Sequence, residues 1–548
     1  MRHLIKSVLV FITFALVAAG CSSSTPQSSQ DNAQQQQQEQ KPSEDKQFVF
    51  VSQSDVSSID PVKATDEVSL AAIINFYDPL LYPKVGEGSM EPGPHLAEKW
   101  EASPDGKTYT FTLRKDVKFQ SGNPFTANDV VFTIQRILAL KQGNSWLWSD
   151  VLTPESVKAV NDNTVTFSLN KPYAPFVASL TQLYILDSVE LKKNLDKGGQ
   201  FGEMGDYGQK YLEDHVVGSG PYKLAGWERG SKIEFTQFAD YWKGWKENQI
   251  KNFRFQNVSE EATVKTMLAS GEADMVNTWL SVKTFNDLKK MDGITVKEDT
   301  GASLSLLPMN NQKAPMDDIN VRKAISYAFD YETATRDILA GAIQAKGPVS
   351  SIIPGHNKDV TQYVRDIAKA KEFLAKSKYA GQALEIDYMF IGDFPVHRQI
   401  GALLQQNLAE IGIKVNLQAS TWPKIMEATS KKETTPHMFI VDVGLRYPHV
   451  DNHTFGMYHP SVWGNYRGAS WYDNKETSKL LEQARNAVNV DDQMKFYKEA
   501  QKLITEDAPA VYISNPTHRI AYKNYVEGYK YVGVLGYDLA FYNLSLKK

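Results

Sequence analysis

A single cysteine occurs in this chain of 548 residues, and its position limits how the fold can be stabilised. Cys21 follows Arg2, Lys6 and an apolar run over residues 8–19, which is too short to span a bilayer but suits the apolar core of a signal peptide. Small residues precede Cys21, so we expect residues 1–20 to be removed and the thiol to carry acyl chains such as palmitate. No thiol would then remain for a disulfide, and stability must come from core burial. The alternative is an ordinary signal peptide with a cleavage site near a cysteine.

Composition places the rest of the chain among ordinary globular proteins. Hydrophobic residues make up 42% and charged residues 23%, and about 500 residues are enough for two or more domains. The net charge of -4 offers no electrostatic basis for binding nucleic acid. Aromatic residues make up 11%, which is compatible with an aromatic-lined cavity, although most of the rings are expected in the core.

Residues 22–46 are dominated by Ser and Gln and contain almost nothing that could be buried. Such a composition cannot offset the entropy lost on folding. With the acylated cysteine, residues 21–46 are therefore predicted to form a disordered tether.

Strands and helices are predicted along the remaining length. Strands are expected at 48–51, 109–113, 160–169 and 414–418, and helices at 317–329 and 396–410. Thr126 and Asp129 form a capping-box pattern ahead of another helix, and a long helix at 474–505 is interrupted near 489–492. Mixed elements of this kind predict an α/β protein of several lobes.

Several sequence blocks resemble one known family. The longest is LAEKWEASPDGKTYTFTLRKDVKFQSGNPFTANDVVF at 96–132, and others lie at 218–224, 262–275, 321–328 and 402–417. In this order they resemble the extracellular solute-binding proteins of family 5, the oligopeptide, dipeptide and nickel-binding group that serves ABC importers. The blocks extend over nearly all of residues 48–545.

The resemblance implies a two-lobed, periplasmic-binding-protein-like clamshell with a hinge, the first lobe carrying an inserted subdomain. Its boundaries would place the main part of lobe I at 47–80, 217–298 and 516–548, the inserted subdomain at 81–216, and lobe II at 299–515. Closure of the lobes would trap the ligand between them.

The implied function is ligand capture for an importer. We expect a monomer without cofactor, anchored by lipid to the extracytoplasmic face of the cell membrane, which passes a peptide or peptide-like ligand to ABC permease subunits with their ATPases. The Gln- and Ser-rich tether favours a Gram-positive cell. The alternative ligands are a metal chelate, such as a nickel complex, and an oligosaccharide.

The resemblance also indicates ligand-binding positions. Thr65, Asp66 and Glu67 match a segment whose backbone pairs with an extended ligand. Asn277, Thr278 and Trp279 match a second pocket segment, and Trp422 matches a tryptophan that packs on the ligand main chain. For all but Trp422, a surface or hinge contact is an equal alternative.

The segment at 441–452 departs from the peptide-binding pattern. The aspartate that receives the ligand's free α-amine in peptide binders is replaced by Arg446, or by Tyr447 if the alignment moves by one residue, whereas Asp451 and Asn452 match the family's acid-Asn pair. A cation here would repel a free amine, so this segment favours an acidic or N-blocked ligand over a generic peptide.

Histidines cluster in the same region. His449 and His453 are spaced as on a metal-binding helix face, but Pro448 and Asn452 favour a loop. Structural or solvated histidines are therefore the default interpretation, and no metal site is predicted.

An enzyme is the competing class. The chain has no His-Glu-x-x-His motif, no Gly-x-Ser-x-Gly motif and no P-loop. Paired carboxylates of a secreted hydrolase leave no such motif, so this alternative stays open, but the expectation is a protein without enzymatic activity.

The anchor prediction has a direct test. Cys21→Ala should abolish acylation, because only a thiol accepts the diacylglyceryl group, and uncleaved precursor or released soluble protein should appear on cell fractionation. Mature Cys21→Ala protein retained in the membrane fraction would contradict the lipoprotein interpretation.

Overall fold

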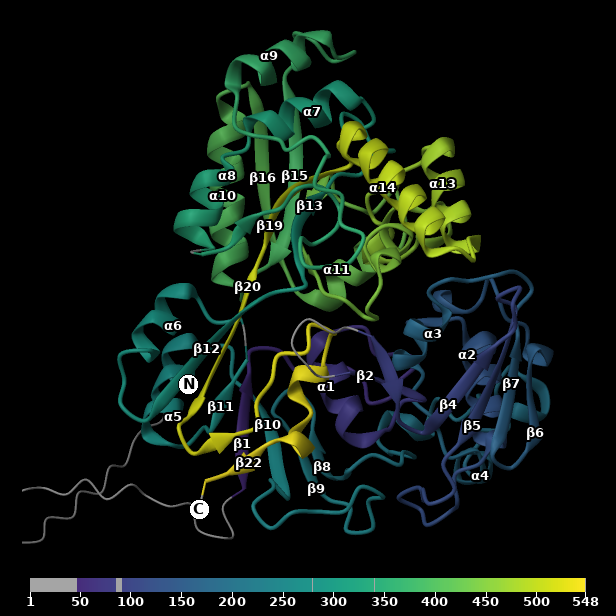
Figure 1. Cartoon of the computed structure of the whole chain (residues 1–548). Helices are drawn as coiled ribbons and strands as arrows, with labels where there is room; N and C mark the ends of the chain where they lie inside the picture. The colour runs from purple at the N-terminus through teal and green to yellow at the C-terminus, as the bar shows by residue number, and fades with distance from the viewer. Residues whose placement is uncertain (1–46, 85–90, 278, 340, 548) are drawn as a thin grey trace, which may run out of the picture. The chain divides into compact units, whose positions relative to one another are not determined.

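A seven-stranded sheet forms the centre of one half of the protein in the computed structural model, which describes residues 47–84, 91–277, 279–339 and 341–547 (Figure 1). The order of its strands is β12 (Ile294–Thr300), β20 (Thr517–Lys523), β11 (Met275–Val276), β1 (Phe48–Ser52), β10 (Asn252–Asn257), β9 (Lys232–Gln237) and β8 (Tyr222–Glu228). β1 runs parallel to both of its neighbours, and all five of its residues are buried. The predicted strand at 48–51 is confirmed.

The other half contains two smaller sheets. One has the order β14 (Ile343–Gln344), β19 (Ala510–Asn515), β13 (Leu304–Pro308) and β18 (Val441–Val443), and the other β16 (Ile413–Ser420), β15 (Leu384–Ile391) and β17 (Met438–Phe439). α10 (Pro395–Ala409) packs on β15 and β16 through Ile400, Leu404 and Leu408. The predicted helix at 396–410 and the strand after it are confirmed.

Two chain segments connect these halves side by side. β12 and β20 pair antiparallel up to Thr300 and Thr517, and β13 and β19 resume the antiparallel pairing beyond them. Only Pro516 separates β19 from β20. A Cβ added at Gly301 would lie 2.2 Å from the Pro516 carbonyl oxygen, so only glycine permits this close approach. The paired crossing forms the hinge of a two-lobed clamshell, as expected (Figure 1).

A separate four-stranded sheet with its own core lies beside the seven-stranded sheet. Its order is β4 (Ala97–Ala102), β5 (Thr108–Leu113), β7 (Thr164–Ser168) and β6 (Val157–Asn161), and α2 (Ala127–Leu140) packs on it. The predicted capping box is present, with the Thr126 backbone N–H donating to Asp129 at 2.8 Å.

One predicted strand was wrong. Residues 160–169 do not form a single strand, because the Asn163 backbone N–H turns back to the Asn161 side chain at 2.9 Å and separates β6 from β7. An Asn-Asp-Asn turn is favourable for this reversal. The break predicted in the long helix is confirmed: α13 (Lys475–Asn486) ends before Asn489, whose side chain caps α14 (Val490–Asp507).

The remaining elements are short. The helices are α1 (Glu67–Phe76), α3 (Phe176–Ser179), α4 (Ser188–Lys193), α5 (Glu261–Ser270), α6 (Val282–Leu288), α7 (Ile319–Ala328), α8 (Tyr331–Thr333), α9 (Ile367–Lys376), α11 (Trp422–Ala428) and α12 (Phe455–Tyr458). The strand pairs are β2 (Leu81–Pro83) with β3 (Pro92–Pro94) and β21 (Val526–Glu527) with β22 (Ser545–Leu546). Within the described part of the chain, no helix combines the length and apolarity needed to cross a bilayer. The domain boundaries given above stay predictions.

A buried ion pair joins α2 to the segment that follows β1. Arg136 donates two hydrogen bonds to the Asp60 carboxylate, at 2.9 and 2.5 Å, and both side chains are buried. Arg136→Met should lower the free energy of unfolding by about 3–5 kcal/mol, because Asp60 would be left charged in a dry site. Urea unfolding of the variant and the wild type measures the difference, and equal midpoints would contradict the assigned role of the pair.

Candidate functional site

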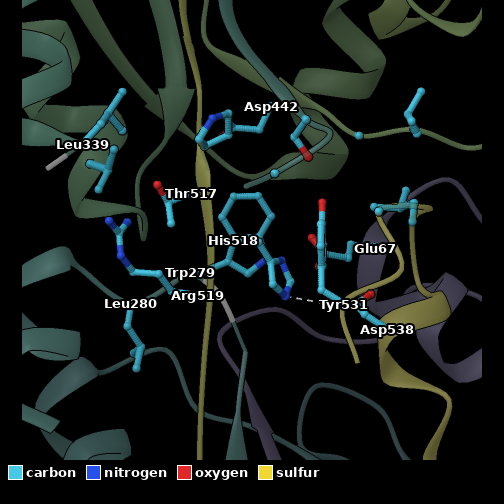
Figure 2. A pocket seen from close by; sticks show the side chains of 18 of the residues that line it. Glu67, Trp279, Leu280, Leu339, Asp442, Thr517, His518, Arg519, Tyr531 and Asp538 are labelled. Carbon is cyan, nitrogen blue, oxygen red and sulfur yellow. Dashed lines mark ion pairs between the residues drawn. The ribbon is translucent and has the colours of Figure 1, made fainter. Parts of the chain in front are cut away.

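A cavity with a volume of about 130 Å³ lies at the hinge (Figure 2). This space could hold on the order of ten water molecules. Its wall includes Gly301, Ser303 and Pro516 of the two crossing segments. The polar and aromatic side chains of the wall come from both lobes: Glu67, Trp279, Phe394, His397, Asp442, His518, Arg519, Tyr531 and Asp538.

Three carboxyl groups from distant parts of the chain meet in this cavity. Glu67 is the first residue of α1, Asp442 lies in β18, and Asp538 comes from the C-terminal segment (Figure 2). His397 lies 3.2 Å from Asp442, and His518 lies 3.2 Å from Asp538. Within the described chain, the Glu67 carboxyl has no hydrogen-bond or ion-pair partner. Of the three carboxyl groups, that of Glu67 is therefore the one left available to a ligand.

The protonation of Glu67 reflects these surroundings. Burial, followed by the charges of Asp538, Asp442 and Asp66, raises the pKa of Glu67 to about 8. Each neighbouring carboxylate disfavours the charged form of Glu67. Near neutral pH, Glu67 can therefore hold a proton and act as a hydrogen-bond donor.

Aromatic rings form the apolar walls of the cavity. Trp279 and Phe394 stack with their ring centres 4.9 Å apart and an interplanar angle of 12°. His518 and Tyr531 form a second stack at 4.3 Å. Trp279 follows β11 of the seven-stranded sheet, whereas Phe394 is the N-cap of α10 in the other lobe, so the first stack bridges the lobes.

The segment after β18 is held by a buried charge network. Arg485 donates to both carboxylate oxygens of Asp451, at 2.8 and 2.7 Å, and Tyr447 and Tyr497 donate to the same group. Burial alone would raise the pKa of Asp451, but the charge of Arg485 outweighs it and holds that pKa below its usual value. Asp451 is therefore a charged anchor for the loop that carries Arg446.

Comparison with known proteins agrees with this two-lobed arrangement. The sequence profile described as "Bacterial extracellular solute-binding proteins, family 5 Middle" matches residues 91–465. The chain belongs to this family. Heme-binding protein A of Haemophilus influenzae is 29% identical over 99% of both chains, and the dipeptide-binding protein of Escherichia coli is 28% identical over 88% of this chain and 92% of its own.

A solved structure of the same kind shares the fold. The periplasmic binding protein DppA from Helicobacter pylori in complex with the peptide STSA superposes with a TM-score of 0.82 at 27% identity, covering 91% of this chain and 98% of its own. The family is one of substrate-binding proteins.

In this family 5 solute-binding protein, two of the predicted ligand residues, Glu67 and Trp279, line the cavity. Asp66 caps α1 by accepting from the Ser69 backbone N–H at 2.8 Å. Asn277 is buried and donates to Ser52 at 3.1 Å. The Thr65 carbonyl accepts a hydrogen bond from Arg446. Thr278 and Cys21 lie outside the described residues.

The remaining predicted residues lie outside the cavity wall. Trp422 begins α11 and packs edge-to-face on Tyr466, with the ring centres 5.0 Å apart. Tyr447 and Asp451 take part in the buried network, and the Asn452 side chain accepts from the Arg446 backbone N–H at 3.3 Å. Their roles in ligand binding stay predictions.

The two weak metal candidates have separate local partners. His449 accepts from the Asp451 backbone N–H at 3.1 Å, and His453 contacts the Val443 carbonyl at 3.1 Å. Burial, with the charge of Arg467, lowers the pKa of His453 to about 3, so this ring is neutral. Within the ranges that the structure describes, no three His, Cys, Asp or Glu side chains are grouped to hold a metal ion.

Several cavity residues had no usable signal in the sequence. His397 lies at the start of a predicted helix and Phe394 just before it, but their contacts with Asp442 and Trp279 form only in the folded protein. Tyr531 and Asp538 belong to a C-terminal segment without long regular elements, in which periodicity carries no information.

Glu67 makes stability dependent on pH. The folded protein retains a proton on Glu67 at pH values where the unfolded chain, with a pKa near 4.5, has released it. The free energy of unfolding should therefore fall as pH rises from 4.5 to about 8. Glu67→Gln should lose less stability over this window.

Urea unfolding of wild type and Glu67→Gln at several pH values measures this difference. Because Glu67 binds at most one proton, the difference in slope stays below about 1.4 kcal/mol per pH unit. Parallel pH profiles would show that Glu67 titrates normally.

Proposed function

We propose that this protein is the extracytoplasmic receptor of an ABC importer and binds a peptide or peptide-like ligand in the cavity at its hinge. The observation that carries the proposal is that both lobes contribute polar and aromatic side chains to one cavity. Ligand sites are concave, with apolar walls and a few converging polar groups, as this one is. The similarity to dipeptide-binding relatives supports the ligand class.

Ligand binding would stabilise the closed form of the clamshell. A ligand in the cavity that touches Trp279 on one lobe and Phe394 on the other gains both contacts only when the lobes are together. Because a ligand shifts a conformational equilibrium by its difference in affinity for the two states, contacts to both lobes favour closure. The Gly301–Pro516 crossing supplies the pivot.

The cellular setting is part of the same proposal. Acylated Cys21 would anchor a monomer to the outer face of the cytoplasmic membrane of a Gram-positive cell. Residues 22–46 would let the folded part of the receptor move away from the membrane surface. The closed receptor would then dock on permease subunits driven by ATPases. The protein would act without a cofactor and without enzymatic activity.

A metal chelate is the second candidate ligand. It is favoured by two histidines on the cavity wall, His397 and His518, and by a relative named heme-binding protein A. Each imidazole already faces a carboxylate, so a peptide-like ligand stays the first candidate. Calorimetric titration with haem or nickel-histidine and with a mixed peptide pool separates the two. An oligosaccharide pool tests the third alternative.

Mass spectrometry of material that co-purifies with the protein should identify a peptide-like molecule. Incubating the protein with the identified molecule and recovering it unchanged would separate a receptor from a hydrolase. Recovery of cleaved product would contradict the proposal.

Trp279→Ala should weaken binding of the identified molecule about tenfold or more, because a large ring surface between the lobes is lost. Calorimetry measures the loss. Trp227→Ala is the matched control, because Trp227 lies on β8 and outside the cavity wall. Equal losses in both variants would indicate a general effect on folding.

A further inference from the structure

Arg446 is a buried cation without a carboxylate partner in the described chain. Its side chain is 1% exposed. One terminal nitrogen, Nη2, donates to the Thr65 carbonyl at 2.6 Å and to the Tyr466 hydroxyl at 3.3 Å. The other two nitrogens, Nε and Nη1, are buried and have no hydrogen-bond partner. The guanidinium therefore has unused donors on two of its three nitrogens.

A second buried guanidinium lies nearby. Arg467 is 4% exposed and donates to the carbonyl oxygens of Asn452 at 2.6 Å and Gly456 at 3.3 Å. Tyr466 lies between the two cations. Burial alone would raise the pKa of the Tyr466 phenol, but the charges of Arg446 and Arg467 outweigh it and hold that pKa below its usual value. The group has excess positive charge.

Two other buried arginines are paired with carboxylates, whereas Arg322 donates to backbone carbonyls. Arg136 pairs with Asp60 and Arg485 with Asp451, each through two short hydrogen bonds. Placing a charge in a dry interior without a counterion is strongly unfavourable, and such groups in proteins are paired or serve a ligand. A guanidinium presents parallel N–H donors that fit the two oxygens of a carboxylate or phosphate.

We propose that Arg446, with Tyr466 and Arg467 beside it, is the binding subsite for an oxyanion of the ligand, either a carboxylate or a phosphate. The inference rests on the proposed function and specifies the ligand as one that carries an anionic group. The anion accepts a hydrogen bond from one of the two free nitrogens, Nε or Nη1, which lie on different edges of the guanidinium.

The subsite adjoins the cavity along two stretches of chain. Leu445 lines the cavity and directly precedes Arg446, and Thr65, which accepts from Arg446, lies two residues before Glu67. A ligand with its anion on Arg446 can therefore place a neighbouring polar or cationic part against the carboxyl groups of Glu67 and Asp442. Trp422 packs edge-to-face on Tyr466 of the same group.

The first test measures the stability of the ligand-free protein. Arg446→Met removes the unpaired charge at nearly constant volume, so the melting temperature should stay equal or rise by about a degree or more. Arg136→Met, which leaves Asp60 unpaired, should lower it. A fall in Arg446→Met as large as that in Arg136→Met would mean that Arg446 is a structural residue and would overturn the proposal.

The second test measures charge preference. Wild type and Arg446→Met are titrated calorimetrically with a tripeptide pool in free-acid form, with the same pool as N-acetylated free acids, with its C-terminal amides, and with inorganic phosphate. Wild type should bind one oxyanion form, either a free-acid pool or phosphate, at least about 30-fold more strongly than the amides, and Arg446→Met should lose that preference. Trp422→Ala should bind every form more weakly but should retain the preference for the oxyanion form.

The outcomes separate the two proposals. Equal binding of acids and amides by wild type and Arg446→Met would overturn the anion subsite and leave the receptor function standing. Absence of binding by every pool and by phosphate would contradict both.

Tyr466 provides an independent signal. The difference in ultraviolet absorbance between wild type and Tyr466→Phe during a pH titration reports this phenol alone. Its pKa should rise when the bound probe neutralises Arg446, and also in Arg446→Met, whereas an unchanged titration would count against the subsite.

Discussion

The close approach of two extended segments at Gly301 and Pro516 is the constraint on which the arrangement of this protein depends. A side chain at Gly301 would occupy the position of the Pro516 carbonyl, so only glycine lets both connections cross together. The antiparallel pairing of β12 with β20 and of β13 with β19 continues on both sides of the crossing. Residues adjoining the crossing segments, including His518 and Arg519, thereby become part of the cavity wall. The pivot and the cavity share Gly301 and Pro516, so a ligand bound in the cavity would be coupled to closure of the lobes.

Charge is distributed unevenly around this pivot. The cavity wall collects Glu67, Asp442 and Asp538, and their mutual repulsion contributes to the raised pKa of Glu67. Close by along the chain, Arg446 has two buried donors without partners. The loop that carries it is anchored by the pair of Asp451 with Arg485, which offsets the unfavourable burial of both charges by close contact. An interior with every polar group paired would be more stable in the absence of ligand. Proteins depart from such pairing mainly at functional sites.

Local patterns in the sequence were sufficient for most of the secondary structure and for the family. The capping box at Thr126 and Asp129, the N-cap at Asn489 and the alternation in β5 all act between residues a few positions apart, so they can be recognised without the fold. The error at 160–169 has the same origin, because continuous alternation extends across a turn whose reversal depends on one side chain, Asn161. The likeness at 96–132 predicted the clamshell because it matches a family and not because composition requires that fold.

The residues of the cavity and of the Arg446 group likewise include some that the sequence predicted and some that it did not. Glu67 and Trp279 were predicted from blocks that resemble the family, and both line the cavity. The pairing of His397 with Asp442, the contribution of Tyr531 and Asp538, and the missing counterion of Arg446 were decided only by the tertiary structure. The sequence by itself determined most of the chain's helices and strands and its family, and its single cysteine excludes an internal disulfide, because these follow from neighbouring residues and from composition. Which charges face one another, and which remain unpaired, depends on segments hundreds of residues apart that meet only when the hinge strands cross.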